Sequence, residues 1–269
     1  MARIASLQNP LIKMIRSLNQ RKHREQEGMF FAEGIRVVEE AVAAGVPVER
    51  VIYAPERLRS DRAMGTVRAL EGGGAEVVEV SDRVFDALSG REEGQGIGAV
   101  IRIPERTLED IPAGPEALVA VLVEPRDPGN LGSILRTADC AGASGVVVVG
   151  TSADLYDPKC VRASMGSLFA AVAVSVPDLG TCLAWARSQG LRCVATSARA
   201  ERSCFAFGLT GPLALILGPE RGGLDEGAVG QCDALVRVPM RGRASSLNLA
   251  SAAAVLMYEA VRQRMEEKR

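Results

Sequence analysis

The chain of 269 residues is 47% hydrophobic, 24% charged and 4% aromatic, which is typical of about two globular α/β domains and excludes a disordered protein. Its net charge of −1 gives no general attraction to nucleic acid, and no apolar run reaches the roughly 20 residues of a membrane span. With no apolar signal region, six scattered cysteines and His23 as the only histidine, we expect a cytoplasmic protein with reduced thiols and no metal site.

The first predicted domain covers residues 1–103 and begins with a basic arm. Residues 1–24 contain six Lys or Arg and no Asp or Glu. Residues 10–27 have the spacing of an amphipathic helix, and its end is crowded by three basic residues: Arg21, Lys22 and Arg24. This cluster has two interpretations, a solvated helix end that suits the helix dipole or contact with an RNA backbone.

Strands and helices alternate through the rest of this domain. We expect strands at MFFAEG, Val48–Ala54, Val77–Val80 and the end of GREEGQGIGAVIRI, and helices at Ile35–Ala44, Arg62–Leu70 and Asp82–Leu88. The alternation predicts a small α/β/α domain that ends near Ile103. Residues 104–116 are rich in proline and acid and are interpreted as a linker.

The second predicted domain, residues 117–269, also alternates. We expect strands at Ala117–Val123, Val146–Gly150, Ala171–Val176, Leu191–Thr196, Leu213–Leu217 and Ala234–Val238, and helices at Leu131–Ala141, Pro158–Ser164, Leu179–Gln189 and from about Ser246 onward. This pattern predicts a parallel sheet, whose loops at the carboxyl ends of the strands form a ligand crevice.

Three polar loops follow apolar strands in this second domain: EPRDPGNLG, LGPERGGL and VPMRGRASSLN. They contain glycine and the polar residues Asn130, Glu220, Ser246 and Asn248. Each residue also has a structural interpretation: Asn130, Ser246 and Asn248 as helix caps, and Glu220 as a brace of its own loop. Because the loops are expected at one sheet edge, we favour a binding site. None of them matches a P-loop or the glycine fingerprint of a dinucleotide site.

The segments NLGSILRTADCAGASGV, LILGPERGGL and VPMRGRASSLNLASAAAVLMYE resemble, in this order, the three signature motifs of the SpoU/TrmH RNA 2'-O-ribose methyltransferases of the SPOUT class. The resemblance covers about residues 117–262. Residues 1–103, with RKHR and FAEG, look more loosely like the ribosomal-protein-like RNA-binding domain that often precedes this catalytic domain. The resemblance implies a parallel-sheet SPOUT domain with a deep trefoil knot, S-adenosylmethionine as cofactor, and a homodimer with the RNA site at the subunit interface.

The resemblance also assigns residues by motif. It implies that Gly218 passes close to the cofactor, that Val238, Met240 and Leu247 hold its adenosine through main-chain groups, and that Thr196 belongs to the same pocket. The polar set around the transferred methyl group and the ribose consists of five residues: Asn130, Arg136, Glu220, Ser246 and Asn248. Ser245 stands where the family often has glutamate, and Arg241 and Arg243 make the third loop more basic than usual.

Arg136 has the most specific expected role, because an arginine in a packed helix needs an anionic partner. Its planar guanidinium suits a developing alkoxide and the neighbouring phosphate, whereas its deprotonation as a general base is very unfavourable. Proton transfer assisted by phosphate or by water is the alternative.

The expected function is therefore methyl transfer from S-adenosylmethionine to a ribose 2'-hydroxyl of RNA, most simply 23S ribosomal RNA. A tRNA substrate is the first alternative. A non-catalytic RNA-binding protein of ribosome assembly with the same fold is the second, and a Rossmann-type nucleotide enzyme, which would bind NAD, is the third.

Overall fold

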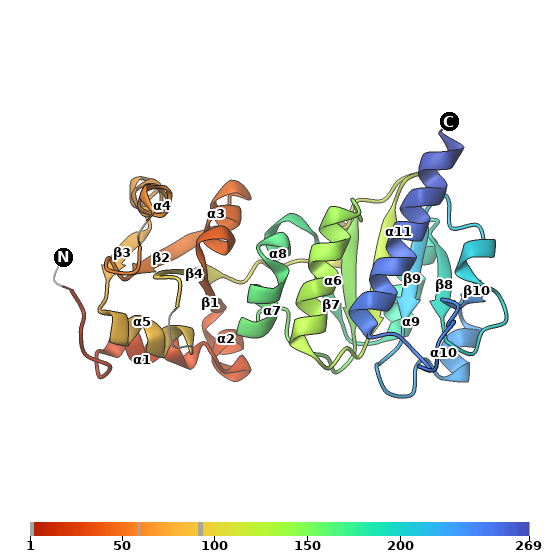
Figure 1. Ribbon diagram of the computed structural model, residues 1–269, viewed down its shortest axis with the longest axis horizontal. Helices are drawn as coiled ribbons and strands as arrows, with labels where there is room; N and C mark the ends of the chain where they lie inside the picture. The colour runs from red at the N-terminus through yellow and green to blue at the C-terminus, as the bar shows by residue number, and fades with distance from the viewer. Residues whose placement is uncertain (1–2, 59, 91–93, 269) are drawn as a thin grey trace. The chain divides into compact units, whose positions relative to one another are not determined.

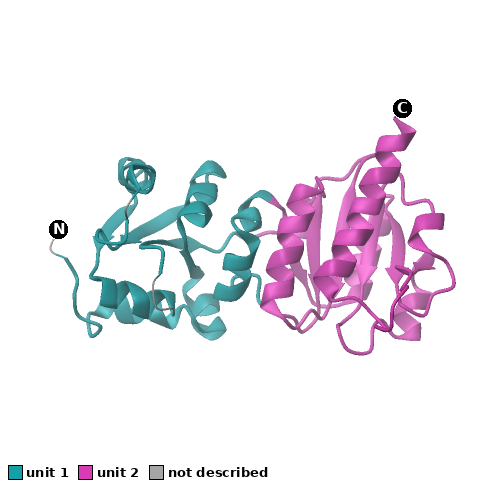
Figure 2. Ribbon diagram, viewed as in Figure 1, with its two compact units in different colours: residues 1–105, 154–170 teal, residues 106–153, 171–269 magenta. Residues whose placement is uncertain are grey.

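The computed structural model describes residues 3–58, 60–90 and 94–268, which form two compact units (Figures 1 and 2). Unit 1 consists of residues 1–105 and 154–170, and unit 2 of residues 106–153 and 171–269. The segment 154–170 falls inside the range expected for the second domain, but it packs with unit 1. Among the described residues, no helix combines the length and apolar character needed to cross a membrane.

Unit 1 contains a four-stranded mixed sheet in the order β1-β4-β2-β3. Its strands are β1 (Met29–Glu33), β2 (Val48–Tyr53), β3 (Glu76–Glu79) and β4 (Ile97–Arg102). Its helices are α1 (Pro10–Ser17), α2 (Arg21–Glu27), α3 (Ile35–Ala43), α4 (Asp61–Gly72), α5 (Asp82–Ser89), α7 (Pro158–Ser164) and α8 (Ser167–Ala170). The apolar faces of α1 and α5 cover one face of the sheet and share a core with it, whereas α3 and α4 contact strands from the other face (Figure 1). The expected α/β/α arrangement is thus present.

The expected single helix over residues 10–27 is wrong, because the chain forms two helices there. The first helix, α1, ends at Ser17, and Gln20 adopts an extended conformation with φ −101° and ψ 131° before α2 begins. Leu18 at the break is only 1% exposed. Its carbonyl oxygen accepts a hydrogen bond of 2.7 Å from Nη1 of Arg24. The break therefore buries an apolar side chain and gives its backbone a partner that helical periodicity could not reveal.

Unit 2 contains a six-stranded sheet in the order β10-β8-β9-β5-β6-β7, and all of its strand pairs are parallel, as predicted. The strands are β5 (Leu118–Val123), β6 (Gly145–Val149), β7 (Ala173–Val176), β8 (Arg192–Thr196), β9 (Leu213–Leu217) and β10 (Ala234–Val236). The helices are α6 (Pro128–Cys140), α9 (Leu179–Ser188), α10 (Glu226–Gly230) and α11 (Leu249–Glu267), with short 3-10 turns at η1 (Leu108–Asp110) and η2 (Cys204–Ala206).

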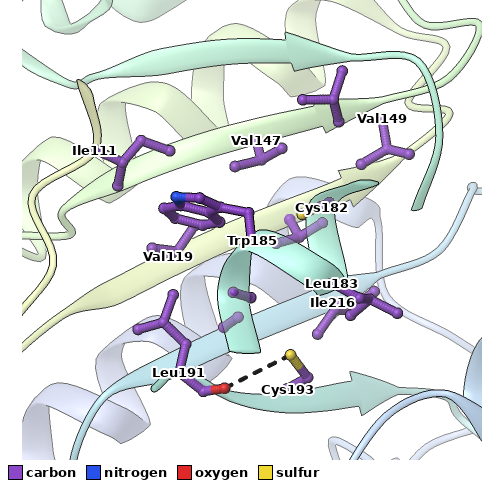
Figure 3. Packing of buried hydrophobic residues seen from close by; sticks show 14 of the residues in the cluster. Ile111, Val119, Val147, Val149, Cys182, Leu183, Trp185, Leu191, Cys193 and Ile216 are labelled. Carbon is purple, nitrogen blue, oxygen red and sulfur yellow. Dashed lines mark hydrogen bonds between the residues drawn. The ribbon is translucent and has the colours of Figure 1, made fainter. Parts of the chain in front are cut away.

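Both faces of this sheet are covered, which explains why its central strands are continuous apolar runs. Val119 and Val121 of β5 belong to the same buried cluster as Trp185 and Cys182 of α9. Figure 3 shows Val119 beside Trp185 in this cluster. The opposite face is covered by α6 and α11, which lie side by side in front of the sheet in Figure 1. The Sγ of Cys193 donates to the carbonyl oxygen of Leu191 at 3.8 Å within the same core.

The helix caps differ from those expected. The cap of α6 is Asp127, whose Oδ1 accepts from the backbone N–H groups of Gly129 at 2.6 Å and Asn130 at 3.1 Å. Asn130 lies inside the first turn, so the alternative interpretation of this residue as the cap is wrong. The C-terminal helix begins at Leu249 rather than near Ser246, and Asn248 is its cap. The side chain of Asn130 is therefore available for contacts outside its own helix.

Candidate active site

A cavity of about 480 Å³ lies at the carboxyl ends of β8 and β9 and beside the segment that joins β10 to α11. This volume is within the range of small-molecule sites, roughly 300–1,000 Å³. All five residues expected to hold a cofactor line it: Thr196, Gly218, Val238, Met240 and Leu247. Three separate loops thus meet at the edge of the sheet where a parallel α/β fold binds its ligands.

Gly218 is required by close packing inside this site. A Cβ atom at this position would lie 2.5 Å from the backbone nitrogen of Leu224 and 2.7 Å from the carbonyl carbon of Gly223. The loop can make this approach because Gly222 and Gly223 have φ values of +91° and +70°, which residues with a side chain rarely adopt. The glycines of the second loop therefore fold it back onto the end of β9 and shape one wall of the cavity.

The opposite wall is apolar and comes from the start of α11, where Leu249, Ala252 and Leu256 line the cavity. Small and aliphatic side chains at these positions leave room for a flat apolar group. On the β8 side, the hydroxyl of Thr196 donates to the carbonyl oxygen of Ile216 at 3.1 Å. Its oxygen keeps lone pairs that can accept a hydrogen bond from a ligand.

A chain of side-chain hydrogen bonds joins all three polar loops. Oδ1 of Asn248 accepts from the backbone N–H groups of Ala250 at 2.9 Å and Ser251 at 3.4 Å. Nδ2 of Asn248 donates to Oδ1 of Asn130 at 2.9 Å. Nδ2 of Asn130 then donates to Oε1 of Glu220 at 3.2 Å. All the donors point the same way, so the chain runs from the N-terminus of α11 to the Glu220 carboxylate.

Glu220 links two loops rather than bracing only its own. Its Oε2 accepts from the backbone N–H of Arg126 at 3.4 Å, so one carboxylate oxygen binds the loop after β5 and the other binds Asn130 in the first turn of α6. Glu220 also lines the main cavity and a second, smaller one. Its exposed carboxylate is thus held in place at the border of the two cavities.

Ser246 lines the main cavity and is exposed, which places it with Glu220 at the mouth of the site.

Arg136 differs from the other expected site residues, because it lines neither of these cavities. It lies on the exposed side of α6, and its guanidinium has no ion pair or hydrogen bond with a residue that the structure describes. The expected packed environment is therefore wrong, and no acid of the described residues occupies the guanidinium, for which the expected anions are an alkoxide and a phosphate of RNA.

The three basic residues expected to contact RNA have different environments in unit 1. Arg21 and Lys22 are exposed, and Arg21 pairs with Glu25 at 2.7 Å across one helical turn. Arg24 is 2% exposed and its Nε donates to Asp154 at 2.8 Å. An RNA contact by Arg24 is therefore a wrong expectation, because its guanidinium is already buried in a structural ion pair.

Several residues around the cavities did not follow from the sequence. Ser197 and Arg199 line the main cavity immediately after β8. Arg126 and Arg221 line the second cavity. Only their position in the sequence could have identified these four residues, because each lies within five residues of the carboxyl end of a predicted strand or beside a predicted site residue. Among residues 3–58, 60–90 and 94–268, no group of three or more His, Cys, Asp or Glu side chains is placed to hold a metal ion.

Comparison with known proteins gives two family matches. The model described as the SpoU rRNA Methylase family matches residues 117–258, and the model described as an MRM3-like substrate binding domain matches residues 9–99. Both cavities and the hydrogen-bond chain lie within the first match.

Similar proteins match nearly the whole chain. The 23S rRNA (uridine(2479)-2'-O)-methyltransferase of Streptomyces viridochromogenes is 37% identical over 253 residues, which cover 92% of this chain and 88% of the relative. A 23S rRNA (guanosine(2553)-2'-O)-methyltransferase of Bacillus subtilis is 31% identical over 259 residues, which cover 96% and 98%.

Among solved structures, the SpoU methyltransferase AviRb from Streptomyces viridochromogenes in complex with the cofactor AdoMet has a TM-score of 0.88 and 35% identity, and covers 96% of this chain and 100% of that one. The fold, the order of the motifs and the near-complete coverage agree. This chain belongs to the SpoU rRNA methylase family.

Proposed function

We propose that this protein transfers the methyl group of S-adenosylmethionine to a ribose 2'-hydroxyl of ribosomal RNA. The observation that carries this proposal is the arrangement of Glu220, which borders the main cavity and ends a hydrogen-bond chain through Asn130 and Asn248. The names of the similar proteins support the reaction and the class of RNA.

The main cavity fits the methyl donor. Its apolar wall at Leu249 and Leu256 suits a flat adenine ring, and the missing side chain at Gly218 leaves backbone accessible to the ligand. We assign the main-chain groups of Val238, Met240 and Leu247 to the adenosine, and Thr196 to its rim. S-adenosylmethionine supplies an electrophilic methyl group on a sulfonium, so the protein's task is to position the acceptor.

The polar residues at the mouth of the cavity would perform that positioning. Ser246 and Glu220 are exposed there and can hydrogen-bond to ribose hydroxyl groups. Asn130 and Asn248 fix the carboxylate, because each of them uses both its amide oxygen and its amide nitrogen in the chain of bonds. In this assignment the two asparagines are positioning residues, while Glu220 and Ser246 touch the substrate.

Arg136 would stabilise negative charge on the attacking oxygen or on the neighbouring phosphate. Its free guanidinium on the exposed side of α6 supports a role toward a group outside its own chain. We propose a homodimer in which the exposed faces of α6 and α11 pair and bring Arg136 to the RNA site. Tyr258 and Met265 of α11, which are 49% and 60% exposed, supply apolar surface for such an interface.

The C-terminal segment is proposed to be knotted. β10 is an edge strand, whereas α11 contacts α6, β5 and β9 near the middle of the sheet. The connection between them therefore returns across the carboxyl ends of β8 and β9. Threading of this segment through a neighbouring loop would explain why small residues are needed around Gly218.

Residues 1–103 are proposed to select the RNA in the cytoplasm, with Arg21 and Lys22 as exposed contacts. The matched substrate-binding model over residues 9–99 supports this division of labour, with the linker at 104–116 and transfer at 117–269. Testing it by deleting residues 1–103 would be unsound, because this deletion would remove the partners of the segment 154–170, including Arg24 at Asp154. Exchange of Arg21 and Lys22 for alanine is the cleaner change.

The experiment is to incubate the protein with methyl-labelled S-adenosylmethionine and either unmodified ribosomal RNA or bulk tRNA, beside the Arg136→Ala variant. We expect label in ribosomal RNA as an alkali-resistant 2'-O-methylnucleotide, with none for the variant. Label only in tRNA would show that the substrate is tRNA and not ribosomal RNA. Cofactor binding without label in any RNA would favour a non-catalytic assembly protein.

A further inference from the structure

The second cavity adjoins the proposed transfer site and has no assigned role. It measures about 360 Å³ and lies between the loop after β5 and the loop after β9. Six residues line it: Arg126, Asp127, Pro128, Asn130, Glu220 and Arg221. Glu220 therefore forms part of the wall of both cavities.

In this cavity the acidic side chains have hydrogen-bond partners within the protein, whereas the two arginine side chains have none among the described residues. Asp127 accepts from two backbone N–H groups of α6, and the two oxygens of Glu220 accept from the backbone N–H of Arg126 and from the side chain of Asn130. The guanidinium groups of Arg126 and Arg221 are exposed, and neither has an ion pair or hydrogen bond with another described residue. The acids are thus held by donors of the protein, while the two cations remain available to a ligand.

We infer that this cavity binds a phosphodiester of the RNA strand next to the target ribose, with Arg126 and Arg221 as its positioning residues. This inference rests on the proposed function. Two arginines with free fork-shaped donors match the oxygens of a phosphate. The positive end of α6, a helix of 13 residues, adds to the attraction, although its first amides are occupied by Asp127.

Because the second cavity lies beside Glu220, a phosphate bound there would help to orient the target ribose. A ribose at the mouth of the main cavity continues into phosphates on either side, and the second cavity begins at the same carboxylate. Fixing one phosphate there would orient the strand and reduce the freedom of the 2'-hydroxyl before transfer. An RNA phosphate would also separate Glu220 from bulk water on that side.

The test uses the full-length protein and ribosomal RNA fragments, with RNA affinity measured by filter retention over a series of salt concentrations. Arg126→Ala and Arg221→Ala are each expected to weaken RNA binding roughly 10-fold, the loss typical of one hydrogen bond to a charged group. Each change should also lower the slope of log affinity against log salt by about 1, as for one lost phosphate contact. Arg126→Ala keeps the backbone donor to Glu220, so the hydrogen-bond chain stays intact.

Two further variants separate charge from structure. Arg126→Lys and Arg221→Lys should recover most of the affinity and of the salt slope, because a phosphate accepts a point charge as well. Arg187→Ala is the control for the loss of an exposed arginine that lines neither cavity. This side chain donates to the carbonyl oxygen of Gln231, and its removal should leave RNA binding as in the unaltered protein. The affinity for S-adenosylmethionine should be unchanged in all of these proteins.

Alanine variants with the affinity and salt slope of Arg187→Ala would overturn the inference. A loss of affinity with an unchanged slope, not recovered by lysine, would overturn it as well, because it would indicate a structural role. Failure of the proposed function is distinguishable: the unaltered protein would then bind ribosomal RNA without methylating it. Normal methylation by both alanine variants would refute the phosphate subsite alone.

Discussion

Asn248 has two functions, as the cap of α11 and as a member of the hydrogen-bond chain to Glu220, and substitutions can separate them. Its Oδ1 accepts from two N–H groups of α11, and its Nδ2 donates toward Asn130 and hence Glu220. Asn248→Asp keeps an acceptor at the helix N-terminus but loses the donor. If the Asn130 amide turns to donate to the new carboxylate, its oxygen then faces Glu220. If the amide does not turn, Asn130 still donates to Glu220, but its oxygen faces the Asp carboxylate without a donor, so the chain loses one hydrogen bond in either orientation.

The expected magnitudes follow from these contacts. Asn248→Ala removes a cap, about 1 kcal/mol, and a side-chain hydrogen bond of about 1 kcal/mol. A total near 2 kcal/mol lowers the Tm of a unit of this size by roughly 4–8 °C. Asn248→Asp should change stability by less than about 1 kcal/mol, because Asp caps as well as Asn and suits the helix dipole. Both variants should lower kcat about 10- to 100-fold if the lost bond to a charged group acts in the transition state.

The assay pairs thermal unfolding with methyl transfer to ribosomal RNA at saturating cofactor and RNA. Asn248→Ser is a useful third variant, since serine caps a helix but lacks the amide donor. An Asn248→Asp protein with the kcat of the unaltered enzyme would refute the chain of bonds as a positioning device. An Asn248→Ala protein with an unchanged Tm would refute the role of this residue as a cap.

Three other predictions concern single sites. Arg136→Ala should abolish transfer without lowering cofactor affinity or Tm, because its side chain is exposed and unpaired among the described residues; turnover within about twofold would exclude it from the reaction. Gly218→Ala should weaken cofactor binding, measured by calorimetry, because the added Cβ would lie 2.5 Å from the Leu224 nitrogen; unaltered affinity would show that this wall is not part of the cofactor site. Burial raises the pKa of the thiols of Cys182 to about 12 and Cys193 to about 11, so at pH 8 both stay protonated and a disulfide reagent should modify exposed Cys140 first. Rapid labelling of either buried thiol in the native protein would contradict this packing.

The order of the strands and the edge of the sheet that carries the candidate site could be predicted from the amino-acid sequence alone. The continuous apolar runs at Leu118–Val123 and Leu213–Leu217 are strands because a parallel sheet covered on both faces needs such segments. The polar loops that follow them meet because parallel strands end at one edge. The family resemblance implied that Gly218 passes close to the cofactor, whereas the packing of the Leu224 nitrogen 2.5 Å from the Cβ position of Gly218 is seen only in the structure.

The partners of particular polar side chains, in contrast, could not be predicted from the sequence. Arg24 has the sequence context of an exposed basic cluster, but Asp154 binds it from 130 positions away. Asn130 and Asn248 are 118 residues apart in the sequence and form a hydrogen bond in the fold. Asn248 therefore binds Asn130 in addition to capping α11, and Asn130 does not cap a helix. Periodicity reports whether a residue faces the core, because burial repeats with the local backbone geometry. Hydrogen bonds and ion pairs depend on which distant groups the fold brings within about 3 Å, and this information is absent from local spacing.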